Sequence, residues 1–378
     1  MRLLHLVEST TAGVRRYVTQ LIERPPVGWS VEVACPEVRE GHFGDVGFVQ
    51  EMKRLGVRTH FLPLRRAISL QDMAAARALA ALLRGDAFDL MHTHSSKAGF
   101  IGRIVGRALG VPVIHTSNGL HFLEQMGLKR WFFLNLERAA GRLGAYTIAV
   151  SEGEREVMIR HRLISRERLR LIHNGVDAGW VRRGAGLPLT EDLHRAVGLA
   201  QQGPLIGAVG RMAPQKDPLT FVRASRRVLT SLPDARFIWC GDGELRPSVE
   251  RLATDWDIPL QVTGHLENVW PLMARLDVFV LSSLYEGLPF ALLEAMALSV
   301  PVVATDVVGT RDVLRDEGAG LLAAPRDEAG LAEAICRTLA QPEQTRRRVE
   351  EAARLVETRY SLERMLASHC DLYAEVMR

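Results

Sequence analysis

The sequence predicts an α/β protein with two doubly wound domains, each a parallel sheet covered by helices. Three observations lead to this prediction. Short β-branched runs alternate with longer amphipathic segments, which is the alternation that βαβ units produce. A chain of 378 residues is too long for a single core. A polar, glycine-containing stretch from His173 to Gly203 separates two halves of similar composition.

The first half contains six runs with the length and composition of buried strands. Amphipathic segments lie between them, such as Leu70–Leu83 and Ala98–Leu109, where Ile101, Val105 and Leu109 recur on one helix face. We expect the strands at Leu3–Val7, Val31–Cys35, Val57–Leu62, Leu90–Thr93, Val113–Thr116 and Tyr146–Val150.

The second half repeats this pattern after residue 203 and ends in helices. Glu328–Leu339 and Arg346–Arg378 are both expected to be helical throughout. The expected strands are Leu205–Val209, Arg236–Cys240, Leu260–Thr263, Val278–Leu281 and Val300–Ala304. The predicted organisation is an N-terminal domain over 1–178, a linker over 179–203, a C-terminal domain over 204–358 and a terminal segment over 359–378.

Composition excludes several classes of protein. Hydrophobic residues make up 47% and charged residues 24%, as in a globular domain. No apolar run reaches the roughly 18 residues that cross a bilayer. The apolar stretch at the start of the sequence is too short, and polar residues follow it too early, for a signal peptide. The four cysteines lie far apart without a CxxC motif, which favours a reducing cytoplasm.

Positive charge is concentrated in the first half. Residues 1–180 carry 25 Lys and Arg against 17 Asp and Glu, whereas the remainder carries 23 against 27. An electropositive half suits an anionic membrane surface or a phosphorylated acceptor. Solvated helix faces explain the same excess equally well.

The strongest motif runs from Ser282 to Ala297 and directly follows an expected strand. Gly287 lets backbone approach a ligand closely, and free amides at a helix start bind hydroxyls or phosphate oxygens. Glu294 stands among apolar residues, where an unpaired carboxylate is costly and a ribose diol would satisfy both oxygens. The alternative for Glu294 is a helix glutamate that faces solvent.

This stretch resembles the Glu-x7-Glu signature of retaining family 4 glycosyltransferases with the GT-B fold. The resemblance implies that Glu286 contacts the donor sugar, that Glu294 contacts the nucleotide ribose, and that amides around Gly287 and Leu288 hold sugar hydroxyls. It also implies two Rossmann-like domains that face each other across a cleft. The terminal helix, from Ser361 onward, would cross back to the N-terminal domain.

A second motif, Gly210 to Pro218, carries two cations. Arg211 binds diphosphate oxygens bidentately and Lys216 supplies a point charge, so both suit a departing diphosphate. Ordinary surface charge is the alternative, but the loop resembles the family's donor-phosphate loop. Similar proteins place Gly241 and Gly243 at the mouth of the nucleotide site and the segment that ends at Leu266 against the base.

Motifs in the first half are less specific. The loop with Gly13 resembles the family's Gly-Gly-Val loop, although Ala12 replaces a glycine. His92 and His94 end a strand, but no carboxylate or third histidine accompanies them at ligand spacing, so we expect no metal there. His94 is expected to contact the acceptor or the sugar, with a structural role as the alternative.

Asn118 stands where the family usually has a histidine near the reaction centre. Asn118 donates a hydrogen bond but does not titrate near neutral pH. His94 and His121 are therefore possible substitutes for the usual histidine.

The predicted function is retaining transfer of a sugar from a UDP- or GDP-sugar, without metal or other cofactor. The resemblance favours a lipid-linked saccharide or another cell-surface glycan precursor as acceptor, and a cytoplasmic enzyme at the inner membrane face, without nucleic acid as a partner. Natural-product glycosylation, a sugar-nucleotide epimerase and a non-catalytic relative remain alternatives. An oxidoreductase fits poorly, because the loop Ser9–Gly13 has one glycine instead of GxGxxG.

Overall fold

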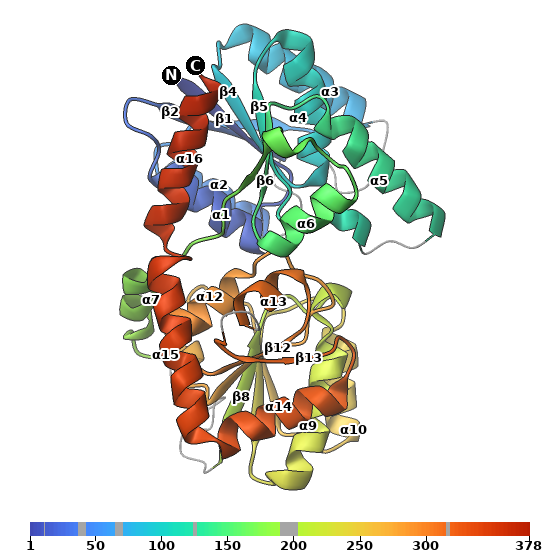
Figure 1. Ribbon diagram of the computed structural model, residues 1–378, viewed down its shortest axis with the longest axis vertical. Helices are drawn as coiled ribbons and strands as arrows, with labels where there is room; N and C mark the ends of the chain where they lie inside the picture. Colours follow the sequence, from blue (N-terminus) through green and yellow to red (C-terminus); the bar gives the residue numbers. More distant parts are fainter. Residues whose placement is uncertain (11, 37–42, 65–70, 124–126, 190–202, 315–317) are drawn as a thin grey trace. The chain divides into compact units, whose positions relative to one another are not determined.

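The chain folds into two compact units in the computed structural model (Figure 1). The structure describes residues 1–378 except 11, 37–42, 65–70, 124–126, 190–202 and 315–317. One unit comprises Met1–His173 and Met365–Arg378, and the other comprises Asn174–Arg364. None of the described helices is both long and apolar enough to span a bilayer.

The first unit is built on a seven-stranded parallel sheet with the order β3-β2-β1-β4-β5-β6-β7. The chain first adds strands on one side of β1 and then continues from β4 on the other side. The space between the ends of β1 and β4 is therefore the topological switch point, where doubly wound sheets bind ligands. The strands are β1 Arg2–Val7, β2 Ser30–Pro36, β3 Thr59–Leu62, β4 Leu90–His94, β5 Val113–Thr116, β6 Tyr146–Ala149 and β7 Leu169–Leu171.

Helices flank this sheet, and the end of the chain joins them (Figure 1). The long helices α3 and α4 pack their apolar faces on the sheet because Leu79, Ile101 and Val105 recur at helical spacing. The helices are α1 Ala12–Glu23, α2 Phe43–Arg54, α3 Gln71–Gly85, α4 Ser96–Leu109, α5 Gly127–Gly141, α6 Glu152–Arg160 and α16 Leu362–Val376, with short 3₁₀ turns η1 His121–Leu123 and η2 Arg166–Arg168.

The second unit has a six-stranded parallel sheet with the order β10-β9-β8-β11-β12-β13. Its switch point lies between β8 and β11. The strands are β8 Leu205–Val209, β9 Arg236–Cys240, β10 Leu260–Gly264, β11 Val278–Leu281, β12 Val302–Thr305 and β13 Leu321–Ala323. The helices are α7 Ala178–Ala185, α9 Pro218–Ser231, α10 Arg246–Asp255, α11 Trp270–Met273, α12 Phe290–Ala297, α13 Val308–Leu314, α14 Glu328–Ala340 and α15 Pro342–Thr358, with the 3₁₀ turn η3 Pro214–Lys216.

Central strands of the second unit are buried on both faces, which explains their continuous apolar runs. All four residues of β11 are buried. Phe221 and Trp239 pack edge to face with ring centroids 5.4 Å apart beneath the sheet. The core therefore fixes the strand ends from which the loops of the candidate site extend.

The two Rossmann-like sheets confirm the predicted fold class, and all eleven predicted strands are present. Some boundaries move: β3 begins at Thr59 instead of Val57, and β12 begins at Val302 instead of Val300. Two short edge strands, β7 and β13, were not predicted. Within the predicted linker 179–203, the residues up to Ala185 belong to α7, and 190–202 lie outside the described residues.

The prediction that Arg346–Arg378 is helical throughout is wrong at residues 359–361, whereas the expected start of a terminal helix at Ser361 lies one residue before α16. The chain leaves the helical conformation between α15 and α16, because its backbone there pairs with another segment. Val176 donates its N–H to the Tyr360 carbonyl at 2.9 Å and accepts from Leu362 N–H at 3.1 Å. This short parallel bridge, centred on Ser361, separates the two helices.

Candidate active site

Four predicted site segments lie at the carboxyl edge of the second sheet, because each directly follows a strand. The loop with Arg211 follows β8, the one with Gly241 follows β9, Leu266 follows β10 and Glu286 follows β11. These four strands are neighbours in the sheet. The sheet order thus brings residues that are far apart in sequence to one edge, around the switch point between β8 and β11.

Hydrogen bonds tie the β8 loop to the β11 loop. Leu284 donates its N–H to the Gln215 carbonyl at 2.8 Å, and Ser282 Oγ donates to the Lys216 carbonyl at 2.7 Å. Gln215 Nε2 also donates to the Tyr285 carbonyl at 3.3 Å. The two loops therefore form one structure.

Lys216 and Glu286 form an ion pair at this junction. The Lys216 ammonium donates to Glu286 Oε1, which also accepts from Ser283 Oγ at 2.7 Å. The Glu286 side chain is 7% exposed and that of Lys216 is 18% exposed, so solvent screens the pair only partly. Arg211 is exposed on the same loop. A basic group thus lies beside a fixed carboxylate, an arrangement that can bind an anion and a hydroxyl next to each other.

Asp217 fixes the direction of the loop as it enters α9. Its backbone is left-handed, with φ of 43°, and its carboxylate caps the helix by accepting from the Thr220 N–H at 3.4 Å. The same carboxylate also accepts from the Thr220 hydroxyl at 2.7 Å. Pro218 occupies the first turn of the helix. This cap places Lys216 two residues before the start of α9.

Glycines permit close backbone approach between the β8 and β9 loops. Gly241 has φ of 138°, and a Cβ there would overlap the Gly210 carbonyl oxygen. A Cβ at Gly243 would overlap the Met212 carbonyl oxygen. The amide of Met212 donates to the Asp242 carbonyl at 2.9 Å. Gly241 and Gly243 thus let the β8 and β9 loops pack directly on each other at the candidate site.

The segment from Gly287 to α12 is held from two sides. Asn174 Nδ2 donates to the Leu288 carbonyl at 2.7 Å. On another side α13 packs so closely that a Cβ at Gly309 would overlap the Gly287 carbonyl oxygen. Sequence reasoning treated Asn174 only as part of a boundary turn; its contact with Leu288 joins segments 114 residues apart and has no local sequence signal.

Glu294 lies inside α12 and is 9% exposed. Its neighbours Leu293 and Ala295 are fully buried. This burial differs from the solvent-facing alternative that the sequence left open. Leu266, predicted to lie against the base, is partly exposed after β10.

In the first unit, Asn118 belongs to a loop organised by a buried carboxylate that the sequence did not single out. Glu154, 1% exposed, accepts from Ser117 Oγ at 2.8 Å, Gly119 N–H at 3.1 Å and Val150 N–H at 2.7 Å. Burial raises the pKa of Glu154, and these hydrogen bonds act in the opposite direction. Asn118 itself has a left-handed backbone with φ of 52°.

The Asn118 side-chain nitrogen is buried and has no hydrogen-bond partner within the described part of the chain. A buried amide N–H without an acceptor is costly, so this group is a candidate donor to a bound ligand. Gly13 is exposed in the first turn of α1. The side chain of His121 lies outside the described residues.

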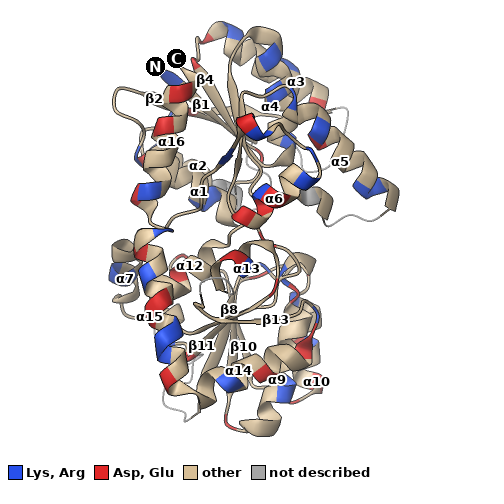
Figure 2. Cartoon of the chain, viewed as in Figure 1, with Lys and Arg blue, Asp and Glu red and all other residues tan. Residues whose placement is uncertain are grey.

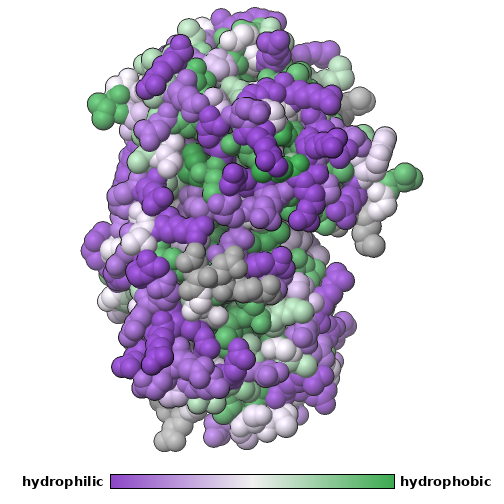
Figure 3. Space-filling view, viewed as in Figure 1, coloured by the Kyte–Doolittle hydropathy of each residue, from purple (hydrophilic) through white to green (hydrophobic). Residues whose placement is uncertain are grey.

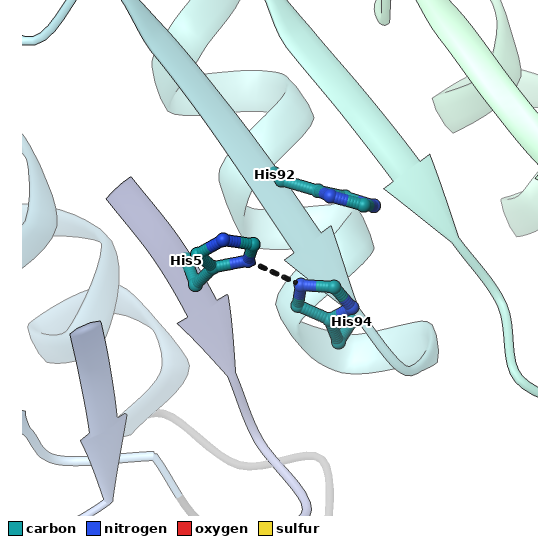
Figure 4. Close-up of side chains that lie close together, drawn as sticks. All are labelled: His5, His92 and His94. Carbon is teal, nitrogen blue, oxygen red and sulfur yellow. Dashed lines mark hydrogen bonds between the residues drawn. The ribbon is translucent and has the colours of Figure 1, made fainter. Parts of the chain in front are cut away.

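Three histidines meet at the switch point of the first unit (Figure 4). His5 on β1 pairs in register with His92 on β4, and His94 lies two residues further along the same face. His5 Nδ1 and His94 Nε2 share a hydrogen bond of 2.9 Å. We expected no third histidine near His92 and His94, and this expectation is wrong. The pairing of β1 with β4 brings His5 next to them, although it is far away in the sequence.

Helix α16 places two more rings, those of His369 and Tyr373, beside these histidines. We call His5, His92, His94 and His369 the histidine cluster. Tyr373 OH lies 2.7 Å from His92 Nδ1, and Tyr17 OH lies 2.6 Å from His369 Nε2. Burial is the main reason why the pKa of all four histidines lies below the ordinary value. The rings are therefore neutral at neutral pH. The His92–Tyr373 bond joins α16 to β4, and the His369–Tyr17 bond joins α16 to α1.

The ligand atoms of His5, His92 and His94 lie within 4.8 Å of one another, as a metal site would require. However, His92 already hydrogen-bonds through both nitrogens, to Tyr373 and to Thr116 Oγ1 at 2.8 Å. No carboxylate of the described residues belongs to the group. We therefore describe it as a hydrogen-bonded cluster. His94 is fully buried in it, so the structure does not expose this side chain to an acceptor.

Each half of the chain matches a known family model. Residues 12–175 match the family model described as glycosyl transferase 4-like domain, and residues 203–341 match the model described as glycosyl transferases group 1. A galactosyltransferase of Escherichia coli, named UDP-Gal:alpha-D-GlcNAc-diphosphoundecaprenol alpha-1,3-galactosyltransferase, is 33% identical over 280 residues, 70% of each chain. The chain belongs to the group 1 glycosyltransferases.

A second relative is named for the transfer of a different sugar. The alpha-D-kanosaminyltransferase of Streptomyces kanamyceticus is 28% identical over 363 residues, 90% of this chain and 86% of the relative. The two relatives therefore differ in the sugar that their names state, galactose in one and kanosamine in the other.

Solved structures support the fold assignment. The crystal structure of HepE from Anabaena in complex with UDP-glucose has a TM-score of 0.82 and 18% identity, covering 99% of this chain and 100% of that one. WaaG, a glycosyltransferase involved in lipopolysaccharide biosynthesis, has a TM-score of 0.76 and 16% identity, covering 98% and 99%. At these identities the likeness shows a GT-B fold.

Proposed function

We propose that this group 1 glycosyltransferase moves a sugar from a UDP- or GDP-sugar to a lipid-linked saccharide, with retention of the anomeric configuration. The observation that carries the proposal is the joined loop pair at the second switch point. There Lys216 pairs with Glu286, Arg211 is exposed on the same loop as Lys216, and the nearly buried Glu294 follows in α12. Cations suit a diphosphate, and carboxylates suit sugar and ribose hydroxyls.

In the proposed reaction, the acceptor hydroxyl attacks the anomeric carbon from the face that the diphosphate leaves. The bond from that carbon to the diphosphate oxygen breaks, and this oxygen takes the acceptor's proton. Arg211 and Lys216 stabilise the negative charge that develops on the diphosphate. Glu286 is paired with Lys216, so it is better suited to orienting the sugar than to covalent attack.

We propose that the diphosphate needs no metal ion, because side-chain cations balance its charge. Transfer should therefore persist in the presence of a chelator. Activity that a chelator abolishes and divalent ions restore would contradict this part of the proposal. The histidine cluster provides a control: a fall in thermal stability on adding chelator would reveal a structural metal in the first unit instead.

Relatives support the choice of donor and acceptor. HepE binds UDP-glucose, and the Escherichia coli relative is named for a UDP-sugar donor and a diphosphoundecaprenol acceptor. The alternative, natural-product glycosylation, is supported by the likeness to the kanosaminyltransferase. Offering a lipid-linked saccharide and an aminoglycoside in parallel, with release of nucleoside diphosphate as the readout, separates the two.

Binding of the nucleotide tests the site before any acceptor is known. UDP and GDP raise the melting temperature of the folded protein if they bind it, so thermal shift identifies the base. Glu294→Gln should weaken the preferred nucleotide about tenfold or more, because hydrogen bonds to a charged group contribute roughly 1.5–3 kcal/mol. Glu333→Gln, on the exposed face of α14, is the matched control. Equal binding by both variants would show that the ribose is held elsewhere.

A further inference from the structure

The first unit presents large apolar side chains at the start of α5. Leu128 is 86% exposed, Trp131 is 64% exposed and Phe132 is 50% exposed. All three lie within about one and a half helical turns, and Lys129 and Arg130 between them are also exposed. Figure 3 shows a hydrophobic protrusion at the edge of the first unit where α5 begins. We call these five residues the α5 tip.

Exposed aromatic and aliphatic side chains that gather in this way usually mark a binding surface. Scattered single residues need no explanation, but here three large apolar side chains and two cations lie within about one and a half helical turns. This composition is typical of a helix that inserts its apolar side chains at a membrane interface while Lys and Arg meet anionic headgroups.

A hollow lined by arginines adjoins the same helix. Its volume of ≈ 520 Å³ lies within the roughly 300–1,000 Å³ of small-molecule sites. None of the described residues that line the hollow is acidic. The basic side chains come from the end of α5, the end of α6 and η2: Arg138, Arg142, Arg162, Arg166 and Arg168.

Two contacts show that this arginine hollow is built into the fold. Arg138 Nε donates to the His161 carbonyl at 2.8 Å, and Arg168 Nη1 donates to the Gly144 carbonyl at 3.1 Å. Burial, followed by the charges of Arg130, Arg138 and Arg160, lowers the pKa of His161. Arg130 of the tip and the hollow therefore contribute to one positive field. Figure 2 shows the basic residues along α5.

We infer that the α5 tip and the arginine hollow together form a surface that docks on an anionic phospholipid membrane. The apolar tip enters the headgroup layer, and the hollow receives a lipid phosphate. The surface would hold the enzyme where a lipid-linked acceptor resides, so it extends the proposed function. Membrane binding can nevertheless be measured without any transfer reaction, and the two proposals fail independently.

The test uses the full-length protein with vesicles of phosphatidylglycerol and phosphatidylcholine in equal proportion, and with phosphatidylcholine alone. We expect co-sedimentation with the mixed vesicles that falls steeply as salt is added. Arg142→Gln and Arg166→Gln should each weaken binding about fivefold, since one basic residue near an anionic surface contributes about that factor. Arg77→Gln, exposed on α3 of the same unit, is the matched control.

Trp131 reports on insertion directly. Brominated phosphatidylglycerol should quench part of the tryptophan fluorescence, and Trp131→Phe should abolish this quenching while the protein still sediments with vesicles. Trp131→Ser combined with Phe132→Ser should remove binding, whereas Met73→Ser, at a side chain that is 55% exposed on α3, should not.

Three results would overturn the inference. The first is the absence of vesicle binding at low salt. The second is binding that Arg77→Gln or Met73→Ser weakens as much as the surface variants do. The third is a dimer in solution that the double Ser variant dissociates, since it would show that a second copy of this chain covers the tip.

Discussion

The side-chain amide of Asn174 donates a hydrogen bond of 2.7 Å to the carbonyl oxygen of Leu288. This bond joins the first residue of the second unit to the segment that follows Glu286. Both residues are buried, Asn174 with 4% and Leu288 with 3% of their surface exposed. Removing the donor therefore leaves a buried carbonyl oxygen without its partner.

We expect Asn174→Ala to lower the free energy of unfolding by about 1–3 kcal/mol. The same variant should raise the KM for the donor, because the segment with Gly287 and Leu288 loses one of its supports. Urea denaturation and steady-state kinetics measure the two effects. Asn135→Ala, which removes an exposed amide bond to the Trp131 carbonyl, is the control. A destabilised Asn174→Ala enzyme with an unchanged KM would refute the positioning role.

The ion pair of Lys216 and Glu286 gives the second prediction. Lys216→Met removes a cation from the proposed diphosphate site and leaves Glu286 unneutralised. We expect kcat to fall by about 10²–10³, the usual cost of losing one group that stabilises transition-state charge. Arg2→Met breaks a comparable pair with Glu32 in the first unit and should leave kcat unchanged. Similar kcat losses in both variants would point to general destabilisation.

Much of the fold was predictable because its signals are local. Buried parallel strands such as Val278–Leu281 are continuous apolar runs, and each site loop directly follows one. The missed strand β7, Leu169–Leu171, is only three residues long and contains Arg170, so it lacks such a run. The break at Ser361 has no local signal, because no glycine or proline marks it and a bridge to Val176 makes it; only the family resemblance put the start of a helix at Ser361.

The missed parts of the sites depend on pairing between distant segments. His5 shares a hydrogen bond with His94 across 89 residues, and only the register of β1 against β4 brings them together. In the sequence, Glu154 looks like any glutamate in the first turn of a helix. Its buried position is visible only in the structure, where Ser117 and Gly119 hydrogen-bond to its carboxylate. No spacing rule contains such information.

Gly241 gives the third prediction. Its φ of 138° and the nearby Gly210 carbonyl oxygen exclude a side chain. We expect Gly241→Ala to cost about 1–3 kcal/mol of stability through backbone strain and to weaken binding of the nucleotide. Gly85→Ala, where a Cβ meets nothing within 4 Å, should be neutral or slightly stabilising. Calorimetry of both variants with UDP or GDP measures the difference. An intact nucleotide affinity in Gly241→Ala would place the ligand away from the β8 and β9 loops.

The histidine cluster predicts how stability depends on pH. Burial lowers the pKa of His369 from 6.5 to about 4 and, together with the charge of His369, lowers that of His5 to about 3. Below pH 6.5 the unfolded chain therefore binds protons that the folded chain does not bind. The stabilising contribution is complete above the unfolded pKa and is lost as the pH falls toward the folded pKa.

For His369 this loss occurs between about pH 6.5 and pH 4, at about 1.4 kcal/mol per pH unit. Urea denaturation across this window should show the free energy of unfolding falling with pH. His369→Gln removes one titrating group while its amide can still bond to Tyr17 OH, so the slope should become shallower. His265→Gln, on the exposed surface of the second unit, should leave the slope unchanged. If His369→Gln keeps the original slope, the His369 ring is protonated in the folded protein. The ring would then form its hydrogen bond to Tyr17 in the charged state.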